Sequence, residues 1–348
     1  MRQSLLATKI VWSMLAIFAL STTPSRAFEI EAEQYFAATD GTSEITIMST
    51  ADLSVFAPLV LGFQNQNPSV NVRYVVLSSA ELYSAVLEGE ATPDLVISSA
   101  MDLQTKLAND GFAQPFRSQA TETLPAWARW RDELFAFTLE PAVLILSKAA
   151  FADLPRPRTR QELIELLRDN PARFENRIGT YDLRTSGLGY LFGTQDARQS
   201  ETFWRLSEVM GALQTRLYCC SGQMIADVKS GKLALAYNVL GSYADAQSES
   251  NVDIVLLEDY TSVMMRTAFI PDSAKNSQLA GTFINYLLSA DGRSLLRAEI
   301  GPGPLDAETF SSDQNLRPIR LGPGLLVYLD QLKRRSFLRA WTSAIVQP

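Results

Sequence analysis

Short runs of β-branched and apolar residues alternate with longer segments of helical periodicity near the start of the chain. The longer segments repeat apolar residues at the spacing of a helix with one buried face. This alternation is typical of an α/β fold with mostly parallel strands. It predicts three β–α units in a row, with strands at 45–50, 70–77 and 94–98 and helices at 52–66, 80–88 and 101–109.

A long apolar run at 134–147 is interrupted by Glu140 and Pro141. Proline ends the hydrogen-bond ladder of a sheet, so we place a strand break there and interpret the run as a crossing into a second lobe. A similar run at 262–271 is interpreted as the return crossing. The elements predicted between and after the crossings are helices at 159–168, after Ser186, at 201–213, 277–288 and 291–299, and strands at 177–182 and 232–238.

The pattern therefore predicts two hinge-linked α/β lobes, with parallel or mixed sheets and helices on both faces. Without the leader described below, roughly 320 residues remain, which suits two lobes at about 150 residues each. The expected divisions are a polar N-terminal segment at 28–43, lobe 1 at 44–138 plus 266–300, lobe 2 at 139–265, and a connection with a C-terminal packing helix (about 324–345) at 301–348.

The first residues are typical of an export signal. The basic residues Arg2 and Lys9 precede an apolar run at 10–20, and the small residue Ala27 precedes the expected cleavage point. A membrane anchor is the alternative, but the run is shorter than the ~20 residues that a spanning helix needs. No cysteine near the cleavage point offers a site for a lipid. We expect residues 1–27 to be removed and the soluble mature chain to act in the periplasm.

Charge and composition narrow the possible partners. The leader holds three basic residues and no acid, so its removal lowers the formal net charge from −7 to about −10. Such a chain is repelled by phosphate backbones, and we expect no nucleic-acid partner. A small anion is still possible, because local donors and helix N-termini determine its binding at short range.

Histidine is absent from the sequence, which excludes Ser-His-Asp and Cys-His nucleophiles and His-based metal sites. We expect no catalytic residues, no metal and no cofactor. A secreted hydrolase that uses Ser186 or Ser98 with a lysine base is an alternative, although neither serine lies in a G-x-S-x-G turn. The two cysteines, Cys219 and Cys220, are adjacent. A strained disulfide between them is possible in an oxidising compartment, but we favour two small buried thiols.

Hydroxyl side chains follow the predicted strands of lobe 1. Ligands of open parallel sheets bind beyond the carboxyl ends of the strands, so these positions are candidates for binding. Ser and Thr are also ordinary helix N-caps, and capping is the preferred explanation for the pair that follows the second strand, Ser78 and Ser79. Capped helix N-termini that converge on one cleft would present backbone N–H groups to an anion. The candidate pairs are Ser49 with Thr50 and Ser98 with Ser99.

In lobe 2 a strand gives way to Arg184, Thr185, Ser186 and Gly187 before a helix. Arg184 could bind a carboxylate or phosphate with two hydrogen bonds, and Gly187 would let the backbone approach a ligand. A capped helix with a solvent-facing arginine is the alternative explanation. The end of a later strand carries Tyr237, Asn238, Gly241, Ser242 and Tyr243, which also fit a strand-to-helix turn with one buried tyrosine.

Several of these segments resemble one family. The segments are "TPDLVISSAMDLQTKLANDG", "YDLRTSGLGY", "GKLALAYNVLGSYA" and "RTAFIPDSAKNSQLAGTFINYLLSADG". They are similar to extracellular solute-binding proteins of bacterial ABC importers, of the type 2 periplasmic binding fold, and the ferric-iron-type group is the closest. The resemblance covers about 45–298, and the C-terminal helix also fits.

Iron carriers of that group present two consecutive tyrosines after the strand that corresponds to 233–237, usually with a His or Glu. Here Tyr237 and Tyr243 are separated. The chain is more similar to the phosphoglycerate transport regulatory proteins, which feed a membrane sensor and imply a phosphorylated or carboxylated ligand. A ferric carrier that uses these tyrosines with carboxylates such as Glu81 or Asp182 remains the alternative.

The resemblance implies that a hinge near 138–141 and Arg266 closes two lobes on a small anionic organic solute. The implied partners are an inner-membrane ABC permease, a membrane sensor kinase or both, and the chain is expected to be a monomer. By position, the implied cleft residues are Ser49, Thr50, Ser98, Ser99, Arg184, Thr185, Ser186, Gly187, Tyr237 and Asn238.

Overall fold

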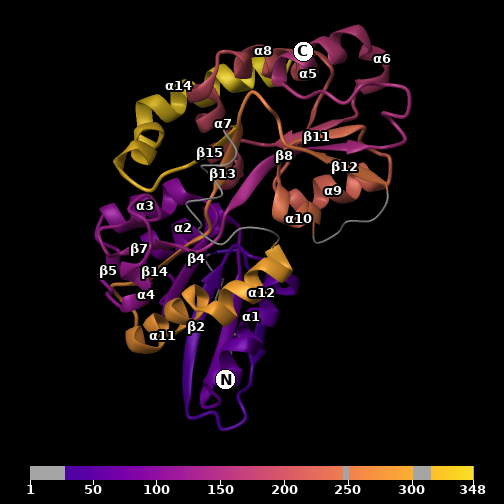
Figure 1. Cartoon of the computed structure of the whole chain (residues 1–348). Helices are drawn as coiled ribbons and strands as arrows, with labels where there is room; N and C mark the ends of the chain where they lie inside the picture. The colour runs from indigo at the N-terminus through magenta and orange to yellow at the C-terminus, as the bar shows by residue number, and fades with distance from the viewer. Residues whose placement is uncertain (1–27, 246–250, 301–314, 348) are drawn as a thin grey trace, which may run out of the picture.

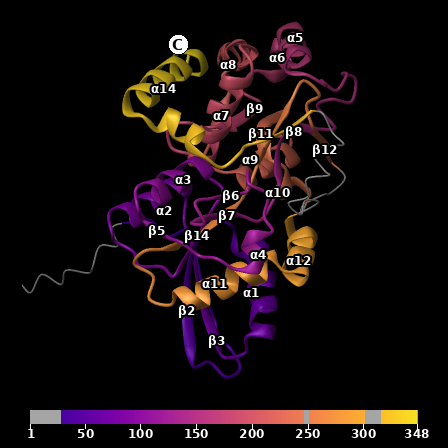
Figure 2. The ribbon, with the colours of Figure 1, turned by 60° about the vertical axis from the view of Figure 1, so that its left-hand side comes forward.

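The structure is a computed structural model that describes residues 28–245, 251–300 and 315–347. It has the predicted two-lobed α/β architecture, with one sheet in each lobe (Figures 1 and 2). The predicted leader, 1–27, lies outside the described residues, as does 301–314 of the predicted connection. None of the helices in the described ranges is long and apolar enough to span a membrane.

Lobe 1 is built on an eight-stranded sheet, ordered β1-β3-β2-β4-β14-β7-β6, with β5 paired to β14. The three predicted β–α units are present, and β2 runs parallel to both β3 and β4. The strands are β1 (Ala32–Phe36), β2 (Ser43–Ser49), β3 (Val70–Val76), β4 (Leu95–Ser98), β5 (Ala113–Gln114), β6 (Arg129–Trp130), β7 (Leu134–Ala136) and β14 (Thr267–Pro271). The helices are α1 (Leu53–Gln66), α2 (Ser79–Leu87), α3 (Met101–Asn109), α4 (Gln119–Glu122), α11 (Ser277–Leu288) and α12 (Ala290–Ile300).

The buried apolar face of α1 explains why α11, which follows the return crossing, packs in lobe 1. Phe56 and Phe63 of α1 are fully buried and contact the ring of Phe283 in α11. Burial of each such side chain contributes about 1.5–3 kcal/mol. The polar segment at 28–43 also belongs to this lobe, because β1 pairs antiparallel with β3 at the sheet edge.

Lobe 2 is built on a seven-stranded sheet, ordered β10-β9-β11-β8-β13-β15, with β12 paired to β8. The strands are β8 (Glu140–Ser147), β9 (Ile178–Tyr181), β10 (Arg216–Tyr218), β11 (Leu235–Leu240), β12 (Val252–Val255), β13 (Thr261–Met264) and β15 (Leu316–Pro318). The helices are α5 (Arg160–Asp169), α6 (Pro171–Phe174), α7 (Gly187–Gln199), α8 (Thr202–Ala212), α9 (Ser221–Lys229) and α10 (Gly241–Asp245), followed by the 3₁₀ helix η1 (Pro323–Leu329) and α14 (Gln331–Ile345).

The first crossing breaks earlier than the proline pattern predicted. β7 ends at Ala136 and β8 begins at Glu140, so Pro141 lies inside β8 and pairs with Val263 of β13. Proline is tolerated there because it is the second residue of the strand, where the ladder is only beginning. The return crossing is also interrupted, between β13 and β14.

The C-terminal helix is shorter than predicted. Asp330 caps α14 by accepting hydrogen bonds from the backbone N–H groups of Leu332 and Lys333, and the residues before it form η1. α14 then packs along α8, as Figure 2 shows in yellow. The C-terminal segment therefore covers lobe 2, while η1 contacts α3 of lobe 1.

Candidate functional site

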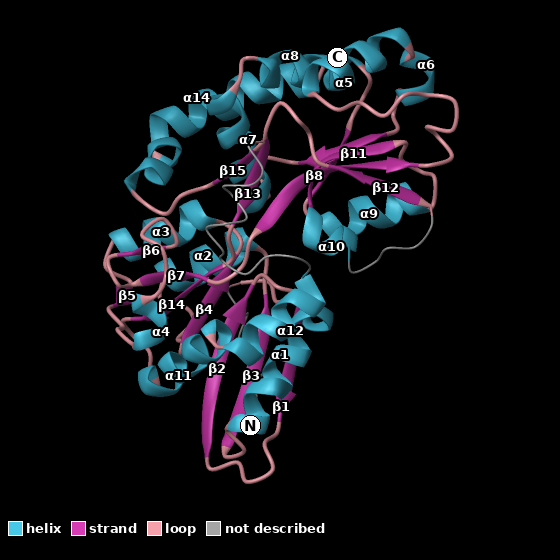
Figure 3. Ribbon diagram, viewed as in Figure 1, coloured by secondary structure: helices cyan, strands magenta, loops and turns pink. Residues whose placement is uncertain are grey.

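A cleft with a cavity volume of about 110 Å³ lies where the two lobes meet, and we call it the interlobe cleft. Strands β2 and β3 of lobe 1 point toward lobe 2 in Figure 3. Lobe 1 and its N-terminal segment contribute Glu31, Thr50, Asp52, Leu77, Ser78, Ser79 and Ser99 to the lining. Lobe 2 contributes Tyr181, Thr185, Ser186, Leu188, Cys219, Cys220, Ser221, Gly222, Leu240 and Tyr243, and the return crossing contributes Arg266.

Only one residue of each predicted lobe 1 pair reaches the cleft. Thr50 and Ser99 do so, and the backbone N–H of Ser99 donates to Thr50 Oγ1 at 3.0 Å. Ser49 and Ser98 are buried, and their hydroxyls accept from the N–H groups two residues further along. The two buried serines therefore shape the turns rather than the lining.

The helices that begin at the cleft include α2 of lobe 1 and α7 and α9 of lobe 2. Ser78 caps α2 by accepting from the N–H of Glu81, and Ser186 caps α7 by accepting from the N–H of Gly189. α9 begins at Ser221 and has no side-chain cap. Helix N-termini carry a partial positive charge and N–H groups without intrahelical partners, so their convergence favours an anion.

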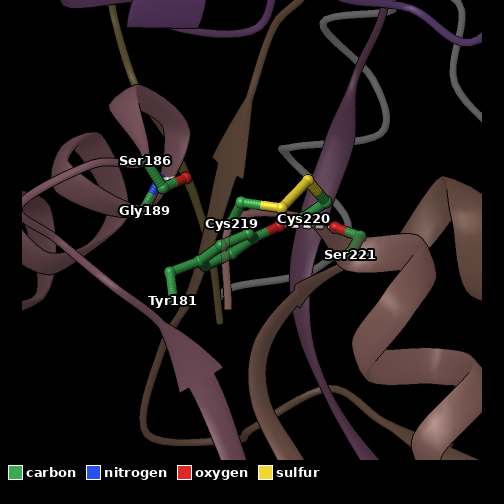
Figure 4. The surroundings of a disulfide bond; sticks show 6 residues. All are labelled: Tyr181, Ser186, Gly189, Cys219, Cys220 and Ser221. Atoms are coloured by element: carbon green, nitrogen blue, oxygen red, sulfur yellow. Dashed lines mark hydrogen bonds between the residues drawn. A yellow bond between two sulfur atoms is a disulfide. The ribbon is translucent and has the colours of Figure 1, made fainter. Parts of the chain in front are cut away.

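The expectation of two buried thiols is wrong. Cys219 and Cys220 form a disulfide and are both exposed, because they lie in the turn between the edge strand β10 and helix α9, where no core residue covers them (Figure 4). The alternative that the sequence left open, a bond between neighbours, is the one present.

Arg266 is the charged group at the centre of the hinge. Its side chain is 1% exposed, and its Nε and Nη2 each donate to Glu140 at 3.1 Å. Burial lowers the pKa of Arg266, but Glu140 raises it and the net direction is upward, so the guanidinium stays charged. Nη1 has no hydrogen-bond partner among the described residues.

The hinge hydrogen bonds tie both crossings together. Glu140 accepts from Thr138 Oγ1 at 2.7 Å and from Ser242 Oγ at 2.5 Å, and the Arg266 N–H donates to Thr138 Oγ1 at 2.8 Å. These residues come from the first crossing, the return crossing and α10. A ligand on Arg266 would therefore contact the residues that connect the two lobes.

Arg184 lies beside the interlobe cleft rather than in it. With Thr185, Ser186 and Gly187 it lines a neighbouring hollow, which we call the side pocket and which also includes Asp102 and Arg334. Arg184 is bonded to Asp182 through Nε at 2.8 Å and Nη2 at 2.6 Å. This pairing occupies the two donors that were expected to bind an anion.

Tyr237 and Asn238 do not reach the cleft. β11 continues to Leu240, so both lie inside the strand, and a φ of 59° at Asn238 accompanies a bulge in its pairing with β8. The Tyr237 hydroxyl accepts from Arg160 Nε at 2.7 Å and donates to Asp196 Oδ2 at 2.7 Å. These residues belong to a buried network of lobe 2.

Two carboxylates face the cleft. Burial raises the pKa of Asp52, while Arg266 and the Tyr243 hydroxyl oppose that shift. Burial also raises the pKa of Glu31, and the charge of Asp52 adds to the effect. Both carboxylates would repel an anion when ionised. A cleft that binds anions therefore does so through Arg266 and the helix N-termini, against this repulsion.

From the sequence, Arg266 is expected in the hinge and not among the binding residues. A signal was present, because Arg266 is the only charged residue in the apolar run at 262–271. A charge inside a buried apolar segment needs a partner, so Arg266 could have been singled out. Tyr181 and Ser221 also line the cleft and carried no comparable signal, whereas Tyr243 was named only at the strand end and in the ferric alternative.

The model of the family "Bacterial extracellular solute-binding protein" matches residues 45–299. The substrate-binding protein of an ABC transporter from Agrobacterium tumefaciens is similar, with a TM-score of 0.87 and 34% identity over 91% of this chain and 99% of that one. No curated protein matches in sequence.

Two more distant structures share the fold. AfuA from Actinobacillus pleuropneumoniae, with fructose-6-phosphate bound, has a TM-score of 0.70 and 13% identity over 88% of this chain and all of that one. Iron-bound HitA from Pseudomonas aeruginosa has a TM-score of 0.67 and 15% identity over 87% of this chain and 99% of that one.

Proposed function

Because the chain belongs to the bacterial extracellular solute-binding proteins, it is a solute-binding protein of an ABC transport system, and we infer that its solute is a small organic anion held in the interlobe cleft. The family is one of transport proteins rather than enzymes. The fold itself does not select the ligand, since AfuA holds a sugar phosphate and HitA holds iron.

The unpartnered Nη1 of Arg266 carries this proposal. A buried guanidinium nitrogen without a hydrogen bond is costly, and an oxyanion in the cleft would supply the missing acceptor. The N-termini of α2, α7 and α9 add N–H donors around the same space. The proposed ligand set is Arg266, Thr50, Ser78, Ser79, Ser99, Thr185, Ser186 and Ser221.

Ligand capture would work by hinge closure. The interrupted crossings, β7 to β8 and β13 to β14, let the two rigid lobes rotate about Glu140 and Arg266. An anion that contacts both lobes binds the closed state better than the open one and shifts the population toward it. The closed protein would then be recognised by a membrane permease.

A ligand screen tests the proposal directly. Thermal unfolding would be followed with phosphate esters, dicarboxylates and sulfonates, and a ligand at 100 times its Kd adds about 2.7 kcal/mol of stability. We expect at least one small organic anion to raise the unfolding temperature. Stabilisation by neutral or cationic solutes alone would contradict the proposal.

Removal of the Asp52 charge is expected to strengthen anion binding. At pH 7.5 and low salt, Asp52→Asn would raise the affinity for a sulfonate about fivefold, since a like charge nearby costs roughly 1 kcal/mol. Because burial raises the pKa of Asp52, lowering the pH from 8 to 5 would strengthen binding in the parent and less so in the variant. Calorimetric titration measures both.

Asp272→Asn, which changes an exposed carboxylate outside the cleft lining, serves as the control for the Asp52 experiment and is expected to have no effect. Weaker binding by Asp52→Asn would contradict the repulsion and would show Asp52 accepting a hydrogen bond from the ligand.

Gly187 permits the close approach of the lobes. A Cβ at Gly187 in α7 would lie 2.6 Å from Ser79 Oγ and 3.0 Å from Leu103 Cδ1, both in lobe 1. Gly187→Ala is therefore expected to hold the lobes apart and weaken ligand binding about tenfold, with little change in thermal stability. Small-angle X-ray scattering would show a larger radius of gyration for the variant.

The matched control is Gly324→Ala, where an added Cβ meets nothing within 4 Å and φ is not positive. We expect it to bind like the parent. Equal affinity of the Gly187 and Gly324 variants would mean that closure does not bring α7 against α2.

We also propose a location, membrane partners and a ligand class for this protein. We place the chain in the periplasm, exported by the predicted leader, with a permease and a sensor kinase as membrane partners. The phosphorylated or carboxylated ligand implied by the resemblance to phosphoglycerate transport regulatory proteins remains a prediction. A ferric role is not favoured, because Tyr237 is held in the Arg160 network and only Tyr243 of the pair lines the cleft.

A further inference from the structure

The disulfide forms part of the cleft wall. Cys219 and Cys220 both line the interlobe cleft, and Cys219 also lines the side pocket. Figure 4 shows the bond beside the ring of Tyr181, with Ser221 beyond it. A bond that only stabilised the fold could be buried, whereas this one is exposed at the candidate site.

The chemistry of this wall differs from that of the anion site. Two bonded sulfurs and their β-carbons carry no N–H or O–H donor, and sulfur is polarizable, so they favour contact with carbon over contact with an ionic oxygen. Leu188 and Leu240 of the same lobe also line the cleft. The cleft thus combines one guanidinium and several hydroxyls with an apolar wall.

The wall is also held in place. A bond between adjacent residues closes a small ring with the backbone, and Cys220 is the N-cap residue of α9. The Ser221 hydroxyl that follows is hydrogen-bonded to the Tyr181 hydroxyl and accepts from the N–H of Leu240 at 3.2 Å. A surface fixed in this way loses little conformational freedom on binding.

We propose that the Cys219–Cys220 disulfide is a platform for the carbon skeleton of the ligand. The solute is then an organic anion with an apolar face, whose charged group lies at Arg266 and whose carbon atoms lie against the sulfurs. This proposal rests on the proposed function of the same cleft. It excludes an inorganic oxyanion as the preferred solute.

The test compares anions of matched charge that differ in carbon content. The probes are inorganic phosphate with phenyl phosphate, and inorganic phosphite with phenylphosphonate, at pH 8, where all four are largely dianions. They are titrated calorimetrically into the parent and into Cys219→Ala/Cys220→Ala, which adds no donor to the wall. We expect the phenyl compounds to bind the parent about five- to tenfold more tightly than the inorganic ions, as burial of a small apolar area provides. In the variant this advantage is expected to vanish, while inorganic-ion affinity is retained.

A second measurement needs no substitution. A dithiol reductant, by thiol–disulfide exchange, transfers two electrons to the Cys219–Cys220 bond, which becomes two thiols, and is itself oxidised to a cyclic disulfide. The reduced parent is expected to lose most of the phenyl advantage. It should regain the advantage when the two thiols are reoxidised by a small-molecule disulfide, which takes up the two electrons and two protons and becomes two thiols. This measurement decides the matter if the double variant does not fold.

The outcomes separate the two proposals. Inorganic ions that bind the parent as tightly as phenyl compounds overturn the platform, and so does a phenyl advantage that survives both the substitution and reduction. If none of the four probes binds the parent, the proposed anion-binding function fails instead.

Discussion

Arg266→Met is expected to lower the free energy of unfolding by about 3–5 kcal/mol and to abolish anion binding. The loss of stability arises because Glu140, which is fully buried, is left without its cationic partner. The loss of binding arises because Arg266 Nη1, which has no partner among the described residues, is no longer there to donate to the anion. Urea unfolding and calorimetric titration measure the two effects separately.

The double variant Arg266→Met/Glu140→Gln separates these effects. It leaves no unpaired buried charge, so we expect most of the stability to return while anion affinity stays at least about tenfold below that of the parent. A double variant that binds anions like the parent would contradict the role of Arg266.

The matched control is Arg160→Met/Asp196→Asn. Arg160 is also 1% exposed and ion-paired, but it lies in the Tyr237 network away from the cleft lining. This variant is expected to lose stability and to keep its anion affinity, measured on the folded fraction.

The second large effect concerns Asp102, in the first turn of α3. Its carboxyl is 3% exposed, and its Oδ1 lacks a hydrogen-bond partner among the described residues. Burial raises the pKa of Asp102 to about 7, against opposing contributions from the N–H groups of Leu103 and Asp102 and from Arg334. The folded protein therefore holds a proton that the unfolded chain releases near pH 4.

Stability should decrease with pH because of Asp102. Between pH 4 and 7 the folded state binds more protons than the unfolded state at this group, so the free energy of unfolding falls as the pH rises. The stabilisation from protonated Asp102 is complete below pH 4 and lost as the pH passes 7. The total is roughly 4 kcal/mol, because about three pH units separate the two pKa values and each unit corresponds to about 1.4 kcal/mol.

Asp102→Asn is expected to remove this dependence and to be more stable than the parent at pH 8. Urea unfolding at pH 5, 6, 7 and 8 measures the difference between variant and parent, which cancels the titration of other groups. Asp110→Asn, at the exposed C-terminal end of the same helix, should run parallel to the parent. A parallel curve for Asp102→Asn would show that Asp102 is ionised in the folded protein.

The lobes were predictable because their signals are local. The segment at 52–66 repeats apolar residues at helical spacing, and Phe56 and Phe63 on that face are fully buried in the structure. The rule that ligands bind beyond strand ends also placed Thr50, Ser99 and Ser186 at the cleft.

Which residue of a pair lines the cleft was not predictable from spacing. Thr50 and Ser99 line the cleft, while their neighbours Ser49 and Ser98 bond to the turn backbone. Adjacent side chains point in different directions, and the turn geometry alone decides between them.

Tertiary structure determined the other differences between the expected and the observed positions of candidate site residues. Asn238 sits at a bulge that carries β11 past the expected strand end, so its side chain meets Asp196 rather than a ligand. Arg184 is paired with Asp182, two residues away. Cys219 and Cys220 face the cleft because the turn that carries them follows an edge strand.

Arg266 is proposed to bind an anion between the lobes. A crystal structure with the tightest-binding anion from the screen tests this proposal most directly. We expect an anion oxygen about 2.7–2.9 Å from Arg266 Nη1, with contacts from residues of both lobes. An anion bound at Arg184 in the side pocket or on the outer surface, with Nη1 still without a partner, would contradict it.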